Sequence, residues 1–124
     1  MHAWKVLVLT LVVTAGLAAP AAAQPAAVTL TVRDGGGPLS GVRVSAVSAG
    51  GTLLATDVTD SAGRVDLRLP RGVRLRLRLA APAGMAEAAL VVGRDLPCAG
   101  TGPIKRCAGT VTVDGLRAMV GPVE

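Results

Sequence analysis

Between Arg64 and Leu79, apolar side chains alternate one by one with mostly charged ones. The only interruption is Pro70-Arg71-Gly72, which has the residue types of a tight turn. Such a strict period of two places every apolar side chain on one face of an extended strand, whereas a helix would scatter them around its axis. The segment therefore predicts a hairpin of two strands, 64–69 and 73–79, each with one buried and one exposed face.

Shorter runs of the same alternation recur along the chain, separated by glycine, proline and aspartate about every ten residues. We expect further strands at 28–32, 42–46, 52–59, 86–92 and 109–114. For 86–92 a short helical turn is the alternative, because the run is rich in alanine and contains a glutamate. Together these segments predict an all-β fold, an antiparallel two-sheet β-sandwich of about seven strands with an aliphatic core.

Three motifs occur in register within this pattern: GGPLSGVRV (Gly36 to Val44), TDSAGRVDL (Thr59 to Leu67) and LPRG (Leu69 to Gly72). Their spacing resembles that of the carboxypeptidase regulatory-like domain, over about Val28 to Leu79. Val65 and Arg74 depart from the family, which usually has aromatic residues at these two positions. The resemblance implies a transthyretin-like sandwich, in the same broad class as immunoglobulin-like sandwiches. It also implies a non-catalytic module attached to, or secreted beside, other proteins.

The start of the chain has the three-part layout of a secretory signal peptide. Lys5 precedes an apolar run over 6–19, and small residues Ala21 and Ala23 stand before Gln24. A run of this length is too short to span a bilayer as a helix, although an uncleaved membrane anchor is the alternative. We expect an exported protein, periplasmic or extracellular, without a membrane span after cleavage. Its expected parts are a signal peptide at 1–23, a Pro/Ala-rich lead at 24–27, the sandwich at 28–114 and a C-terminal tail at 115–124.

The two cysteines, Cys98 and Cys107, agree with export. An even number of cysteines in an exported chain predicts a disulfide bond, here closing a loop at 98–107 that contains glycine and proline. Two thiolates without a histidine supply only half of a tetrahedral zinc shell, so we expect no metal at this pair.

The residue types most used in catalysis are almost absent. The chain has no Tyr and no Phe, and its only His and Trp, His2 and Trp4, precede the apolar run. Among sandwich enzymes, a hydroxyisourate hydrolase would need His and Tyr, and a ring-cleaving dioxygenase would need both on iron. We therefore expect no enzymatic activity and no cofactor, and an enzyme using a carboxylate-bound metal is the alternative. The carboxylates available for it are scattered: Asp34, Asp57, Asp60, Asp66, Glu87, Asp95 and Asp114.

Arginine dominates the charge of the chain, whose formal net charge is +5. Without aromatic stacking platforms this excess does not indicate nucleic-acid binding. The alternation places Arg74, Arg76 and Arg78 on one strand face, and a hairpin would add Arg64 and Arg68. These five arginines form a candidate binding surface for an anionic envelope polymer or an acidic protein, and a solvated outer face is the alternative. We expect an exported accessory or binding module; the alternative is a structural packing subunit of a larger envelope assembly.

Overall fold

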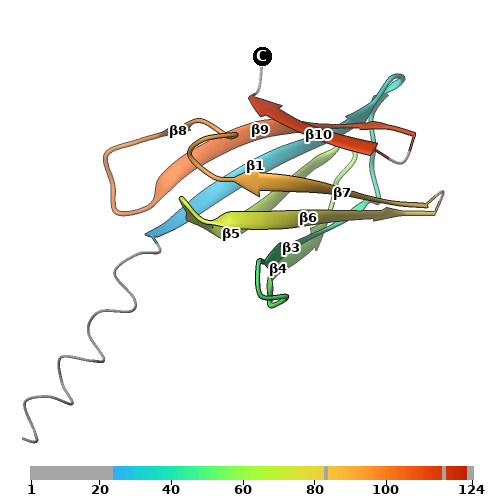
Figure 1. Cartoon of the computed structure of the whole chain (residues 1–124). Helices are drawn as coiled ribbons and strands as arrows, with labels where there is room; N and C mark the ends of the chain where they lie inside the picture. The colour runs from blue at the N-terminus through green and yellow to red at the C-terminus, as the bar shows by residue number, and fades with distance from the viewer. Residues whose placement is uncertain (1–23, 83, 116, 123–124) are drawn as a thin grey trace, which may run out of the picture.

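The computed structural model describes residues 24–82, 84–115 and 117–122, and in these ranges it contains ten strands and no helix that could cross a membrane. The strands lie in two layers (Figure 1). We name each sheet by its central strand. The β1 sheet contains β1 (Gln24–Asp34), β2 (Gly37–Pro38), β5 (Arg64–Arg71), β8 (Cys98–Ala99), β9 (Lys105–Asp114) and β10 (Arg117–Pro122). The β6 sheet contains β3 (Arg43–Ser48), β4 (Leu53–Val58), β6 (Arg74–Ala81) and β7 (Gly84–Val91).

In the β1 sheet, β1 pairs on one side with β5 and on the other with β9. The pairing with β5 is antiparallel, but the pairing with β9 is parallel, so this sheet is mixed rather than purely antiparallel. A parallel pair requires a long crossover connection. The chain provides one, because all four strands of the β6 sheet lie between β1 and β9 in the sequence.

The β6 sheet is antiparallel, in the order β4-β3-β6-β7. Its register is regular except for a shift between β3 and β4, where Val47 pairs with Leu53 and Ala46 with Ala55. Leu54 is therefore the extra residue of a β-bulge on the edge strand β4.

The core between the sheets is aliphatic apart from Cys107, as the sequence predicts. Both sheets contribute side chains to this core, because every second residue of β1, β5, β6 and β7 points inward. The largest fully buried side chains are Leu30, Leu69, Leu75, Leu77, Leu90, Leu96, Val28, Val32, Val44, Val92 and Val111.

The strands extend beyond the limits predicted for the sandwich. β1 begins at Gln24, because 24–27, expected to be a lead, pairs with β5 and buries Ala26. Residues 117–122, expected to be part of a tail, form β10 along β9 and pack Ala118 and Val120 against the core. The segment 86–92 is extended, within β7 up to Val91, rather than helical. The expected signal peptide at 1–23 lies outside the described residues.

The hairpin expected between 64–69 and 73–79 does not form. β5 and β6 follow each other along the chain, but β5 pairs with β1 and β6 pairs with β3 and β7. The turn at Gly72 therefore carries the chain from one sheet to the other. Both strands keep the predicted alternation, because both pack an apolar face against the same core.

Candidate arginine face

The outer surface of the β6 sheet carries the predicted row of arginines. Arg74, Arg76 and Arg78 are exposed and alternate with buried leucines along β6. Successive arginines on one strand face are about 6.6 to 6.8 Å apart. Since β6 has hydrogen-bonded neighbours on both sides, the row runs along the middle of the sheet rather than along an edge.

A fourth arginine, not among the five predicted from the sequence, lies on the same face. Arg43 on β3 is exposed and pairs in register with Ala80, two residues beyond Arg78 on β6. The sequence contains a local signal, because Arg43 alternates with Val42 and Val44. The pairing of β3 with β6, however, depends on a register that alternation alone does not give. We call Arg43, Arg74, Arg76 and Arg78 the arginine face.

One carboxylate in the neighbouring strand faces this group. Glu87 on β7 pairs with Arg78, with 3.1 Å between Arg78 Nε and Glu87 Oε2. Both side chains are about half exposed, at 47% and 49%, so the ion pair adds little stability and is weakened by salt. Four guanidinium groups against one carboxylate leave this face strongly basic.

The other two predicted arginines lie elsewhere. Arg64 and Arg68 are on β5, with their side chains on the outer surface of the β1 sheet. The two outer surfaces of a sandwich point in opposite directions, so the five arginines do not form one surface. Beside them Asp66 accepts a hydrogen bond from the Thr29 hydroxyl at 2.8 Å.

The outer surface of the β1 sheet is hollowed into a shallow groove of about 780 Å³. Short hydroxyl side chains from β1 and β9 line it, with arginine and methionine at its sides. The lining includes Thr31, Arg33, Arg64, Thr110, Thr112 and Met119. This surface is basic too, but its composition differs from that of the arginine face.

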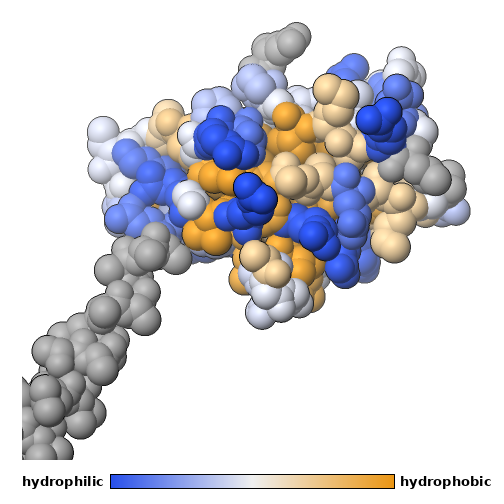
Figure 2. All heavy atoms as spheres, viewed as in Figure 1, coloured by the Kyte–Doolittle hydropathy of each residue, from blue (hydrophilic) through white to orange (hydrophobic). Residues whose placement is uncertain are grey.

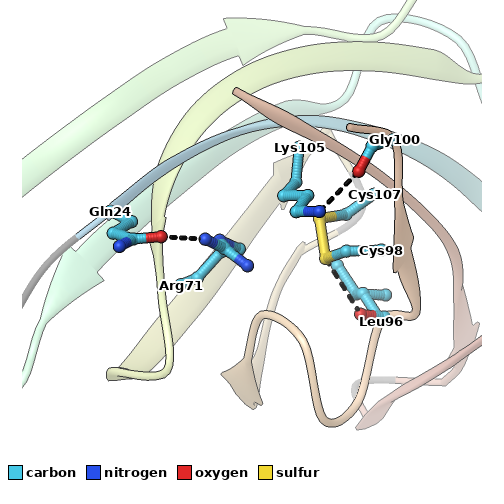
Figure 3. The surroundings of a disulfide bond; sticks show 7 residues. All are labelled: Gln24, Arg71, Leu96, Cys98, Gly100, Lys105 and Cys107. Carbon is cyan, nitrogen blue, oxygen red and sulfur yellow. Dashed lines mark hydrogen bonds between the residues drawn. A yellow bond between two sulfur atoms is a disulfide. The ribbon is translucent and has the colours of Figure 1, made fainter. Parts of the chain in front are cut away.

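The predicted disulfide bond is confirmed. Cys98 on β8 and Cys107 on β9 are register partners with Cα atoms 4.1 Å apart, and their sulfur atoms are bonded (Figure 3). Within the loop that they close, Lys105 Nζ donates a hydrogen bond to the Gly100 carbonyl. The disulfide therefore ties the loop to the β1 sheet, away from the arginine face.

The described carboxylates do not gather into a metal site: the part of the chain that the structure describes contains no group of three or more side chains able to hold a metal ion. Two of them instead hold turns. The backbone N–H of Arg64, 2.9 Å from Asp60 Oδ1, is the main cause of the lowered pKa of Asp60. The pKa of Asp95 is lowered mainly by a hydrogen bond from the Arg94 side chain, followed by one from the Val91 N–H.

No family model matches this sequence, and no curated protein matches it. Among solved structures, the chain is similar to the dioxygenase domain of a dioxygenase carbohydrate-binding protein fusion from the cellulolytic bacterium Streptomyces sp. SirexAA-E. That match has 15% identity and a TM-score of 0.61, and covers 79% of this chain and 84% of the other. It is also similar to the 5-hydroxyisourate hydrolase of Klebsiella pneumoniae, with 17% identity, a TM-score of 0.55 and coverage of 80% and 99%. At these identities the likeness concerns the fold alone, and the chain has a transthyretin-like β-sandwich fold.

Proposed function

We propose that this protein is an exported, non-catalytic binding module that engages an anionic partner through the arginine face. The observation that carries the proposal is the placement of four arginines on one outer surface with a single neighbouring carboxylate. Of these four, only Arg78 forms a salt bridge within the described residues. The other guanidinium groups are available for bidentate contacts with phosphate or carboxylate groups.

The chemistry of the chain supports a role without catalysis. Two of the similar solved structures are a dioxygenase domain and a hydrolase, but the only His of this chain is His2 and the chain has no Tyr. The motifs that resemble the carboxypeptidase regulatory-like domain also point to a non-catalytic module. The disulfide bond and the apolar leader support export, because disulfides persist in oxidising compartments.

Retention on an anionic polymer tests this proposal. The wild type is compared with the triple variant Arg74→Gln, Arg76→Gln, Arg78→Gln on a dextran sulfate column over a salt gradient. A matched control carries Arg33→Gln, Arg64→Gln and Arg68→Gln, which remove the same charge from the outer surface of the β1 sheet. Because both variants have the same net charge, a difference between them reports the location of the binding surface.

We call the triple variant Arg74→Gln, Arg76→Gln, Arg78→Gln the β6 variant. We expect the wild type and the control to elute at similar salt concentrations, and the β6 variant to elute at a much lower one. Screening shortens the range of charge interactions from about 10 Å at 0.1 M salt to about 3 Å at 1 M, so all retention is lost at high salt. Equal early elution of both variants would mean that net charge alone causes retention, and would overturn the proposal. Retention of the β6 variant at the wild-type position would overturn it as well.

A further inference from the structure

We infer that the partner of the arginine face is an anionic phospholipid surface; this inference rests on the proposed function and names the partner class for the same site. Among the described residues, four of the five exposed large hydrophobic side chains belong to the β6 sheet, and only Met119 belongs to the β1 sheet. The four are Leu53 (58% exposed), Leu54 (38%), Val58 (40%) and Met85 (58%).

These apolar side chains border the arginines. Val58, Arg43, Ala80 and Met85 are successive register partners across all four strands, so they form one row on the outer surface. This row has a guanidinium group near its middle and an exposed apolar side chain at each end. Figure 2, viewed with β6 and β7 toward the reader, shows hydrophobic residues exposed among hydrophilic ones.

A second row continues the pattern. Val47 pairs with Leu53 on one side and with Arg76 on the other. Val47 is only 6% exposed, yet it does not belong to the core cluster between the sheets. Val47 is therefore an apolar side chain of the outer surface, covered by its neighbours and lying between Leu53 and Arg76.

The β-bulge explains why the leucines are exposed and argues against a peptide strand as the partner. Leu53 pairs with Val47, and Leu54 is the extra residue between Leu53 and Ala55, so the regular ladder of this edge strand is interrupted. Bulges, short length and charge protect edge strands from pairing with another chain, and β4 has six residues and Asp57 near its end. The β4 edge is therefore poorly suited to pairing with a strand of another chain. Its exposed leucines are better suited to contact with the apolar part of a lipid surface.

A phospholipid surface combines the two chemistries that this face offers. Phosphate groups accept bidentate hydrogen bonds from guanidinium groups, while leucine, valine and methionine side chains can enter the boundary between headgroups and acyl chains. Arginine adapts to such a boundary, because its stem is apolar and its charged end reaches toward water. A hydrophilic polymer would use the arginines and leave the four apolar side chains in water.

The outer surface of the β1 sheet provides the contrast. Its arginines, including Arg33, Arg64 and Arg68, surround alanine and threonine side chains. Among the residues that the structure describes, the one large exposed apolar side chain of this sheet is Met119. Within the described ranges, this surface therefore has charge without a matching set of exposed apolar groups. Lipid binding that depends on both should be specific to the β6 sheet.

Co-sedimentation with vesicles tests the inference. The probes are vesicles of phosphatidylglycerol and phosphatidylcholine in equal amounts and vesicles of phosphatidylcholine alone. The proteins are the wild type, the two arginine variants described above, and Leu53→Ser with Leu54→Ser. All have the same N-terminus, identified by intact mass, because an apolar leader would itself bind lipid. Cooperative unfolding of each variant shows that it is folded.

We expect the wild type to bind the anionic vesicles and not the neutral ones. Since each arginine near an anionic membrane contributes about a fivefold effect, the β6 triple variant should bind roughly a hundredfold more weakly. The leucine variant should lose about tenfold in vesicle binding, because it exposes less apolar surface to be buried. Its elution from dextran sulfate should not change, and the variant Arg33→Gln, Arg64→Gln, Arg68→Gln should bind vesicles like the wild type.

Two outcomes would overturn the inference and leave the proposed function standing: polymer retention without vesicle binding, or vesicle binding by the leucine variant equal to that of the wild type. The second would show that charge alone brings the protein to the vesicle. If the β6 variant matches the wild type on both the polymer and the vesicles, the arginine face binds neither, and both proposals fail.

Discussion

β5 and β6 have nearly the same sequence pattern but belong to different sheets. Each has three inward apolar side chains from Val or Leu and three outward charged side chains. β5 pairs only with β1, at one side of its sheet, whereas β6 is paired on both sides. The alternation therefore determines which face of a strand is buried, but not which neighbours the strand has.

This difference separates the charged surfaces of the molecule. The outward residues of β5 lie on the outer surface of the β1 sheet, where Arg64 lines the threonine-lined groove. Those of β6 lie beside Arg43 and the exposed apolar side chains of the β6 sheet. Two strands with similar patterns thus contribute to surfaces with different chemistry. The site on each surface depends on long-range pairing as much as on the local sequence.

The largest expected effect tests whether both strands pack into one core. Leu69 on β5 and Leu77 on β6 are 1% and 0% exposed. Replacing either by alanine removes buried methyl groups and leaves a cavity, so each variant should lose about 2 to 5 kcal/mol in the free energy of unfolding. Arg68→Gln and Arg76→Gln, on the outer faces, should change it by no more than about 0.5 kcal/mol.

Urea unfolding of the four variants measures these differences. If Leu69→Ala and Leu77→Ala both destabilise strongly while the arginine variants do not, both strands face the same core. A loss below about 1 kcal/mol for one leucine variant would show that its strand does not pack as described.

The glycines at the two ends of β5 give a smaller and more selective effect. Gly63 precedes the strand with φ of 77°, and Gly72 follows it with φ of 75°. Alanine at either position should lose about 1 kcal/mol, because L side chains rarely adopt this conformation. A Cβ on Gly63 would also lie 2.7 Å from the Val32 carbonyl oxygen and 2.8 Å from Pro38 Cβ, whereas one on Gly72 would have no neighbour within 4 Å.

We therefore expect Gly63→Ala to be the more destabilising variant, by about a further 1 to 3 kcal/mol from overpacking. Thermal unfolding of both variants under the same conditions measures the difference. Equal melting temperatures would mean that the turn before β5 is not packed against β1 and β2.

Much of the fold could be predicted from local sequence. Alternation located the longer strands of the two layers. Aspartate and glycine separate two of these strands at 60–63, where the chain turns and the Gly63 N–H donates a hydrogen bond of 2.9 Å to the Asp60 carbonyl. The disulfide bond followed from the even number of cysteines. The β10 strand was missed, because Arg117–Pro122 contains glycine and proline and is stabilised by pairing along β9 rather than by a strong pattern of its own.

The candidate site was only partly predictable. A period of two is enough to place Arg74, Arg76 and Arg78 on one face. The same period could not show that Arg43 belongs to this face or that Arg64 and Arg68 do not, because these assignments depend on which strands pair. The exposed leucines of β4 were also unpredictable, since the bulge that exposes them arises from a register shift against β3.

The smallest expected effect concerns two carboxylates whose pKa values are lowered for different reasons. Asp60, before β5, is stabilised as a carboxylate mainly by the Arg64 backbone N–H. Asp95, after β7, is stabilised first by the Arg94 side chain, 3.2 Å away and largely exposed. A lowered pKa in the folded state means that each group contributes stability at a pH above its unfolded pKa of about 3.9, and loses that contribution as the pH falls through the folded value.

Salt should separate the two groups. Exposed ion pairs are screened, whereas a backbone N–H held by a turn continues to donate its hydrogen bond. Titration of the aspartate carboxyl carbons by NMR, at low salt and at about 1 M salt, should therefore move the pKa of Asp95 back toward its ordinary value more than that of Asp60. Arg94→Gln should raise the pKa of Asp95 at low salt and leave Asp60 unchanged. An Asp60 pKa that rises with salt as much as that of Asp95 would show that charge, rather than the turn before β5, stabilises its carboxylate.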